Sequence, residues 1–151
     1  MNGNSINKLN QEMAHYNKIM VALIGDGSEQ PIIKQAVNIA NDLKANLFVI
    51  HVNDPRAGKM SMMMDSPKKV TADMIQDQIK EYGYESILGK LEFIIAEGES
   101  VAKTIEHYCK DFDLLIVGHR KMSKFKSNIM DSVDEGITNL VPCPVLVVQK
   151  D

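Results

Sequence analysis

The apolar residues of this chain fall into short continuous runs, and segments with helical spacing separate the runs. The first run covers residues 19–24 and leads into residues 25–28 (GDGS), a combination typical of a strand that is buried on both faces. A second run of this kind covers residues 47–52. Between them, apolar positions recur every three or four residues and predict a helix that carries Ile32, Ile33, Ala36, Val37, Ala40 and Leu43. A strand, a helix and a strand in this order are typical of a right-handed parallel crossover.

The second half of the chain repeats this alternation. Further strands are expected at residues 90–96, 114–117 and 145–148. Further helices are expected at residues 71–88, at residues 100–109 and around Val133, Ile137 and Leu140. The connection over residues 53–70 holds prolines and a methionine cluster and is expected to be long and mobile. Five strands that alternate with four helices predict a single-domain α/β fold with a doubly wound parallel sheet.

Length, charge and cysteine content narrow the class of protein. The chain has 151 residues, which suits one domain. Residues 1–16 are polar and lack a periodic apolar pattern, so we expect a flexible N-terminal extension followed by a domain over residues 17–151. The net charge of -3 points to neither a nucleic-acid partner nor a membrane partner. No apolar run approaches the roughly 20 residues of a membrane span. The N-terminus lacks the apolar core of a secretory signal, and two cysteines suit a reducing compartment, so the expected location is cytoplasmic.

A binding crevice is expected beyond the carboxyl ends of the strands, at the point where the strand order reverses. The loop after the fourth strand is the most informative part of that region. It leads from Gly118 through a basic stretch into a helix N-terminus, where free backbone amides and the helix dipole favour an anion. Its candidate anion or phosphate contacts are Arg120, Lys121, Lys124 and Lys126. The alternative is that these side chains form an ordinary solvated surface.

Stretches near both ends of the chain carry a resemblance to a known family. The stretch LLIVGHRKMSKFKSNIMDSVDEGITNLVPCPVLVVQK combines a strand that ends in glycine, a loop that leads to a helix, and Pro-Cys-Pro before an apolar last strand. Near the N-terminus, KIMVAL and ANLFVIHV flank a helix that carries Ala36 and Ala40. In these features, over residues 17–150, the chain resembles the universal stress protein family. The resemblance implies a Rossmann-like, adenine nucleotide alpha hydrolase-like sheet with strand order 3-2-1-4-5. It also implies ATP or AMP as the ligand, with Mg in the case of ATP.

The glycine motif of the nucleotide-binding branch of the family is only partly present. That motif is glycine, two residues, glycine, nine residues, glycine, and then serine or threonine. Gly118 stands at the first position and Ser132 at the last, but Lys121 and Asp131 replace the other two glycines. Glycines let the backbone wrap closely around phosphates, whereas Asp131 would place a negative charge and a Cβ atom beside them. The resemblance therefore implies an ATP site that is weakened or lost.

The first strand departs from the family pattern as well. Many members place an aspartate at its end, and an alignment without a gap puts Ile24 there. Asp26 could take that role only if the loop shifts by two residues, while Val52 matches a residue that lines the base pocket. The candidate nucleotide contacts carried over by the resemblance are Ala22, Ile24, Asp26, Val52, Val117, Gly118, Lys121, Asp131, Ser132 and Val133.

For several candidate residues, a purely structural role is the alternative to a role in ligand binding. Ser132 and Glu135 form a capping-box pattern, and Gly118 can simply let the chain turn out of the sheet. His51 lies inside an apolar run and is interpreted as a hydrogen-bonded core histidine, while His119 is the histidine expected at the crevice. The methionines in residues 60–64 are interpreted as an apolar lid or partner surface rather than as metal ligands.

Two further pairs of residues are interpreted as structural. No catalytic residues are assigned from the sequence. Asp111 and Asp113 are interpreted as a helix-to-strand turn. Cys109 and Cys143 are interpreted as small, largely buried hydrophobes.

The last strand is expected to lie at a sheet edge, where an apolar strand favours pairing with another chain. The resemblance implies a homodimer through this strand, with Val145, Leu146, Val147 and Val148 at the interface.

The sequence leaves two hypotheses for the function of the protein. The first is a non-catalytic stress-response protein that acts through a protein partner and binds nucleotide weakly or not at all. The second is a nucleotide-binding switch or slow ATPase in which the basic loop replaces the glycine cradle.

Overall fold

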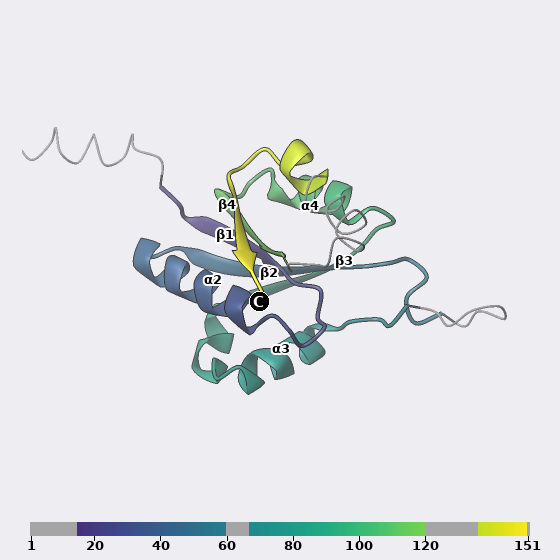
Figure 1. Ribbon diagram of the computed structural model, residues 1–151, viewed down its shortest axis with the longest axis horizontal. Coiled ribbons are helices and arrows are strands. Elements are labelled where there is room, and N and C mark those ends of the chain that lie inside the picture. Colours follow the sequence, from purple (N-terminus) through teal and green to yellow (C-terminus); the bar gives the residue numbers. More distant parts are fainter. Residues whose placement is uncertain (1–14, 60–66, 120–135, 151) are drawn as a thin grey trace, which may run out of the picture.

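The computed structural model describes residues 15–59, 67–119 and 136–150. Its elements in chain order are β1 (Lys18–Ala22), α2 (Gln30–Leu43), β2 (Asn46–Asn53), α3 (Ala72–Glu81), the 3-10 helix η1 (Glu85–Lys90), β3 (Glu92–Glu97), α4 (Val101–Cys109), β4 (Leu114–His119) and β5 (Val145–Gln149). Residues 136–140 are also helical. Figure 1 shows these elements coloured along the chain. No helix within the described residues is long and apolar enough to cross a membrane.

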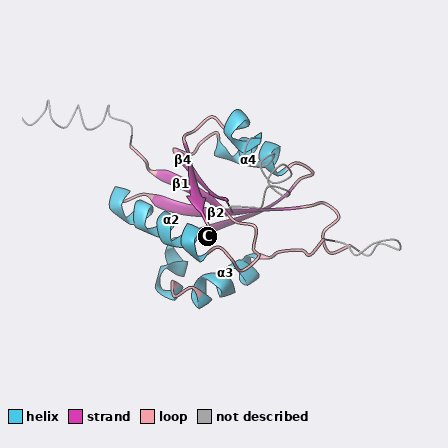
Figure 2. Ribbon diagram, viewed as in Figure 1, coloured by secondary structure: helices cyan, strands magenta, loops and turns pink. Residues whose placement is uncertain are grey.

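The five strands form one parallel sheet in the order β3-β2-β1-β4-β5. The predicted doubly wound α/β fold and its strand order are therefore confirmed. The central strand β1 pairs on both sides, so that Val21 lies beside Val49 of β2 and beside Ile116 of β4. Figure 2 shows helices on both sides of the sheet, with α2 and α3 on one side and α4 on the other.

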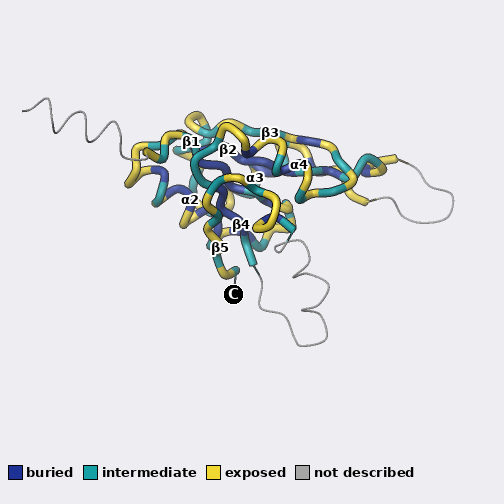
Figure 3. The backbone as a smooth tube through the Cα atoms, turned by 90° about the horizontal axis from the view of Figure 1, so that it is seen from above, coloured by how far each residue is buried: buried dark blue, intermediate teal, exposed yellow. Residues whose placement is uncertain are grey.

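Two hydrophobic clusters fill the space between the sheet and the helices. One cluster joins Ile19 and Val21 of β1 to the buried face of α2 and to Ile75 of α3. The other joins Met20 to Ile105 of α4 and to Ile137. Successive side chains of a strand point to opposite faces, so β1 supplies both clusters, as expected for a strand that is buried on both faces. Figure 3 shows the buried residues concentrated along the central strands.

Several element boundaries differ from those expected. The first strand ends at Ala22, two residues before the end of the apolar run, because Leu23 and Ile24 already belong to the loop. The helix expected over residues 71–88 is divided: α3 ends at Glu81, and Gly83 has a φ of 95° that only glycine adopts readily. The short 3-10 helix η1 then leads into β3.

The turn that follows α4 makes hydrogen bonds to the start of β1. Asp113 Oδ2 accepts hydrogen bonds from the backbone amides of Asn17 and Lys18, both at 2.9 Å. The backbone amide of Asp113 in turn donates to the Lys18 carbonyl oxygen at 2.9 Å. Asp113 therefore lies in the turn between a helix and a strand, as expected, and it also joins that turn to a strand far away in the sequence.

Candidate functional site

A small cavity lies at the carboxyl ends of β1, β2 and β4, where the strand order reverses between β1 and β4. Its volume is about 100 Å³. The residues that line it are Ala22, Leu23, Ile24, Ile50, His51, Val52, Val101, Ile105, Val117, Gly118 and Ile137. Parallel α/β sheets bind ligands at this kind of switch point, so the cavity is the candidate binding site.

The structure brings five of the predicted contact residues together around this cavity, namely Ala22, Ile24, Val52, Val117 and Gly118. Asp26 does not line it. The other predicted contacts lie outside the described residues: Arg120, Lys121, Lys124, Lys126, Asp131, Ser132 and Val133.

The side chains that line the cavity are almost all apolar. Ile24, at the position where many members of the resembled family carry aspartate, has 53% of its surface exposed. His51 is the one polar side chain among the lining residues, and it is buried. Within the described part of the cavity, hydrogen bonds to a ligand would therefore come mainly from the backbone.

His51 is the hydrogen-bonded core histidine that its place in an apolar strand predicted. Its Nδ1 lies 2.8 Å from the Leu23 carbonyl oxygen, and its Nε2 lies 3.1 Å from Asn53 Oδ1. Asn53 is fixed in turn by Val70, whose backbone amide donates to Asn53 Oδ1 at 3.0 Å and whose carbonyl accepts from Asn53 Nδ2 at 2.8 Å. His51 and Asn53 thus connect Leu23, directly after β1, to Val70 at the end of the 53–70 connection.

Gly118 has a packing role that differs from the predicted turn. It lies inside β4, which continues to His119, and it pairs with Val148 of β5. A Cβ atom at this position would clash with Ile32 Cδ1 and would stand 2.9 Å from Lys150 Cε. The interpretation that Gly118 turns the chain out of the sheet is therefore wrong. Glycine suits this position because the side chains of Ile32 in α2 and of Lys150 after β5 approach the strand closely here.

Glu29 is the main residue of this region that sequence reasoning missed. It lies directly before α2, is only 1% exposed, and its carboxylate accepts from the backbone amides of Ile24 at 2.9 Å and of Gly25 at 2.7 Å. Burial raises the pKa of Glu29, and the two amide hydrogen bonds and the Lys150 charge oppose that rise. The carboxylate therefore occupies backbone donors of the β1–α2 loop.

A detectable signal for Glu29 is present in the sequence. Pro31 lies in the first turn of α2 and marks the start of the helix, so Glu29 stands at the N-cap position. A carboxylate at a helix start commonly accepts backbone amide hydrogen bonds, although here it bonds backward to the loop rather than to the first turn of α2.

Lys150 is a second residue that the sequence did not reveal, and its ammonium group lies next to the β1–α2 loop. Its side chain is 9% exposed, and its Nζ lies 3.8 Å from Asp26 Oδ2. Asp26 Oδ1 accepts from the backbone amide of Ser28 at 2.9 Å and from the Ser28 hydroxyl at 2.6 Å. Asp26 thus stabilises the turn of its own loop and does not reach the cavity.

The charges of the described residues around the β1–α2 loop are unfavourable for a phosphate. Two carboxyl groups, of Asp26 and Glu29, face one ammonium group, of Lys150. The loop amides of Ile24 and Gly25, which could otherwise hold an anion, are already bonded to Glu29. Within the described residues, no group of three or more histidine, cysteine, aspartate or glutamate side chains is arranged to hold a metal ion.

The edge strand β5 exposes apolar side chains. It pairs only with β4 in the sheet, and 37% of Leu146 and 42% of Val147 are exposed. Val145 and Val148 are partly buried. The predicted interface residues therefore lie together on the sheet edge, and two of them present apolar surface to solvent.

Solved structures of the same fold include universal stress proteins. One, described as a universal stress protein in complex with cAMP, covers 91% of this chain and 100% of its own, with a TM-score of 0.62 and 18% identity. Another, the universal stress protein from Archaeoglobus fulgidus in complex with dAMP, covers 89% of this chain and 99% of its own, with a TM-score of 0.53 and 14% identity. These similarities place the chain in the class of Rossmann-like α/β proteins with this strand order.

The sequence comparisons are more specific. The model of the universal stress protein family matches residues 15–149. The universal stress protein YxiE of Bacillus subtilis is 26% identical over 148 residues, which covers 89% of this chain and 99% of YxiE. The chain therefore belongs to the universal stress protein family, as its two terminal stretches indicated.

Proposed function

We propose that this universal stress protein acts as a non-catalytic regulatory or interaction protein in the stress response, as a homodimer, with nucleotide binding weakened or absent. The observation that carries the proposal is the pair of hydrogen bonds from Ile24 and Gly25 to Glu29. A buried carboxylate of the chain itself takes up loop amides at the switch point of the sheet, where an anionic ligand would need donors.

The shape and chemistry of the cavity support the same proposal. Its volume of about 100 Å³ is well below the roughly 300–1,000 Å³ of usual small-molecule sites. Its one polar side chain, His51, already faces Leu23 and Asn53. A purine base would therefore gain few directed contacts from the described lining.

A nucleotide-binding switch or slow ATPase is the second candidate function. It is favoured by the two fold neighbours described as complexes with cAMP and dAMP. In this chain, Lys121 and Lys124 would then replace the missing glycine amides. Charge reversal by Lys121→Glu should abolish nucleotide binding, and binding that survives this change would rule the second candidate out.

The melting temperature with and without nucleotide decides between the two candidates. A ligand that binds only the folded state raises the melting temperature by an amount set by its affinity. We expect no shift with millimolar ATP-Mg, ADP, AMP, cAMP or dAMP. A clear shift with any of them, lost in Lys121→Glu, would overturn the first candidate and establish the second.

A further inference from the structure

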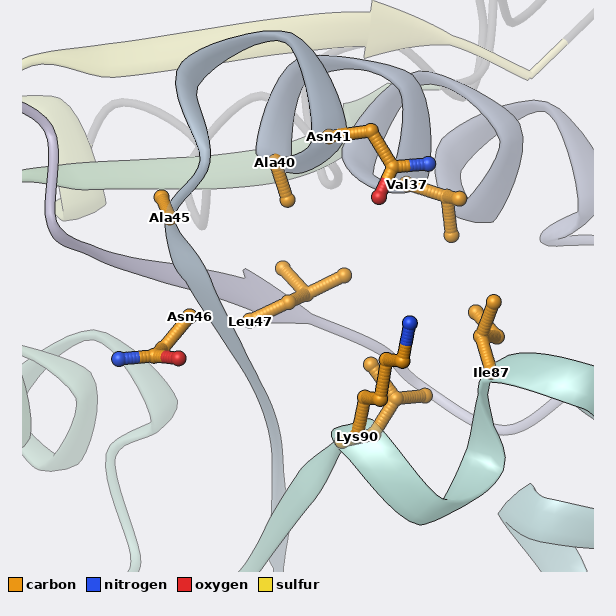
Figure 4. Close-up of a pocket in the computed structure, with 9 residues that line it drawn as sticks. Val37, Ala40, Asn41, Ala45, Asn46, Leu47, Ile87 and Lys90 are labelled. Carbon is orange, nitrogen blue, oxygen red and sulfur yellow. The ribbon is translucent and has the colours of Figure 1, made fainter.

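A second and larger pocket lies at the opposite end of the sheet from the candidate nucleotide site. Its volume is about 390 Å³. It is formed by the second half of α2, the start of β2 and the end of η1, and its lining residues are Val37, Ala40, Asn41, Ala45, Asn46, Leu47, Ile87, Lys90 and Leu91. Figure 4 shows Ile87 and Lys90 facing α2 across this space, with Leu47 of β2 at its side.

The floor of the pocket is aliphatic, whereas its rim is polar and carries Asn41, Asn46 and Lys90. Val37, Ala40 and Leu47 are buried, with 5–7% of their surfaces exposed, and they form the floor. Ile87 and Leu91 are partly exposed and form a wall. The lining contains no aromatic ring on which a nucleobase could stack, so it suits an alkyl chain better than a planar heterocycle.

One charged group stands at the mouth of the pocket. Lys90 is the only charged residue in the lining, and Figure 4 shows its ammonium group extending from η1 toward Asn41 of α2. Both residues are exposed. Within the part of the chain that the structure describes, no hydrogen bond or ion pair engages either side chain. The mouth therefore offers an ammonium and a carboxamide to a polar group of a ligand.

Two of the backbone carbonyl groups at the end of α2, close to the mouth of the pocket, already accept hydrogen bonds. The Ala40 carbonyl accepts from the backbone amide of Ala45 at 2.9 Å, and the Asn41 carbonyl accepts from that of Lys44 at 3.2 Å. Lys44 adopts a left-handed conformation with a φ of 54°, which closes the helix in this way. The carbonyl oxygens of Ala40 and Asn41 are therefore already paired.

We propose that this pocket binds a small aliphatic carboxylate, with its alkyl chain on Val37 and Leu47 and its carboxylate at Lys90 and Asn41. The one charge in the lining, on Lys90, favours an anion, and the aliphatic floor without an aromatic ring suits an alkyl chain better than an aromatic ring. The volume falls near the lower end of the roughly 300–1,000 Å³ range of small-molecule sites, which suits a chain of medium length. The site does not depend on whether a nucleotide binds at the other end of the sheet.

The test uses the full chain, without nucleotide, and a series of butanoate, hexanoate and octanoate. We expect affinity to rise about fourfold for each methylene group that enters the pocket. In two-dimensional amide NMR spectra, octanoate should shift the signals of Ala40, Leu47 and Lys90. An absence of shifts at millimolar octanoate, or shifts confined to Ala22 and Val117 at the other end, would overturn the proposal.

Lys90→Met tests the role of the charge and preserves most of the side-chain volume. We expect this variant to bind octanoate about two- to fivefold more weakly, because an exposed ion pair with the carboxylate is lost, and to bind octanol as the native protein does. Lys34→Met is the matched control, since Lys34 is an exposed lysine of α2 that does not line the pocket. Equal melting temperatures of the two variants show that both are folded. Octanoate binding that is unchanged in Lys90→Met would overturn the proposal.

Discussion

Glu29 Oε1 accepts a hydrogen bond of 2.7 Å from the backbone amide of Gly25. Gly25 has a φ of 76°, and its carbonyl oxygen accepts from Gln78 Nε2 of α3 at 2.9 Å. The hydroxyl oxygen of Tyr82, which follows α3, accepts from the backbone amide of Glu29 at 3.2 Å. The loop after β1 is therefore fixed from two sides: by Glu29, directly before α2, and by Gln78 and Tyr82 at the end of α3.

The burial of Glu29 predicts a specific pH dependence of stability. Its pKa is raised, so the folded state holds the proton more strongly than the unfolded state does. The stabilising contribution is fully present below the unfolded pKa and is lost as the pH rises through the folded pKa. We therefore expect the free energy of unfolding of the native protein to fall, relative to that of Glu29→Gln, as the pH rises above 4.5, the ordinary pKa of the group. Urea denaturation at a series of pH values measures the difference.

A matched control separates this effect from the general titration of the chain. Glu92→Gln changes an exposed carboxylate of β3, so its difference from the native protein should stay nearly constant with pH. If the native protein instead gains stability over Glu29→Gln as the pH rises, the two amide hydrogen bonds outweigh the effect of burial.

The sequence predicted the architecture but missed the groups that fix its loops. Continuous apolar runs locate buried strands directly, and for this reason β1, β2 and β5 were found to within about two residues. Glu29 stands at a helix start that Pro31 marks, but that position does not show that its carboxylate bonds backward to the loop. Lys150 escaped because burial of a charged side chain depends on contacts between residues distant in sequence. The role of Gly118 escaped for the same reason, since the clash with Ile32 exists only after α2 packs on β4.

Close packing predicts that Gly118→Ala destabilises the protein. The new Cβ atom would meet Ile32 Cδ1 and Lys150 Cε. Forcing an extra methyl group into a packed interface typically costs about 1–3 kcal/mol of unfolding free energy. Gly89→Ala is the control, because a Cβ atom there meets nothing within 4 Å. Chemical denaturation of both variants measures the two changes.

A second substitution can remove the Ile32 Cδ1 atom with which the new Cβ atom would clash. Ile32→Val deletes the Cδ1 atom, so the double variant Gly118→Ala/Ile32→Val should lose less stability than the sum of the two single variants. Additive losses would mean that the strain at Gly118 does not arise from Ile32.

The hydrogen bonds of Asp113 predict that this side chain stabilises the start of β1. Asp113→Ala removes the acceptor for the amides of Asn17 and Lys18 and should lower the free energy of unfolding by about 1–3 kcal/mol. Asp111→Ala is the control, since Asp111 is exposed and two residues away. Amide hydrogen exchange at Lys18 should become faster in the first variant only. Unchanged exchange there would show that the sheet holds β1 without Asp113.

The two cysteines are predicted to differ in reactivity toward a thiol reagent. Cys109 is fully buried, and burial raises its pKa to about 12, whereas Cys143 is partly exposed. At about pH 8 only about one Cys109 in ten thousand would be a thiolate, which is the reactive form. We therefore expect Cys143→Ser to react with a disulfide reagent only after denaturation. Rapid reaction of the folded variant would show that the core around Cys109 and Met20 opens readily.

The exposed edge of the sheet predicts the interface of the proposed homodimer. Leu146 and Val147 are both substantially exposed on β5, and an apolar edge strand that meets water on its free side favours pairing with a second copy. Val147→Lys should convert the dimer to a monomer, as measured by light scattering during size-exclusion chromatography, because two copies of the new charge would meet across a symmetric contact. Leu140→Lys is the control, since Leu140 has a similar exposed fraction of 39% but lies in the helix before the strand. A native protein that is monomeric, or a Val147→Lys variant that stays dimeric, would exclude β5 as the interface.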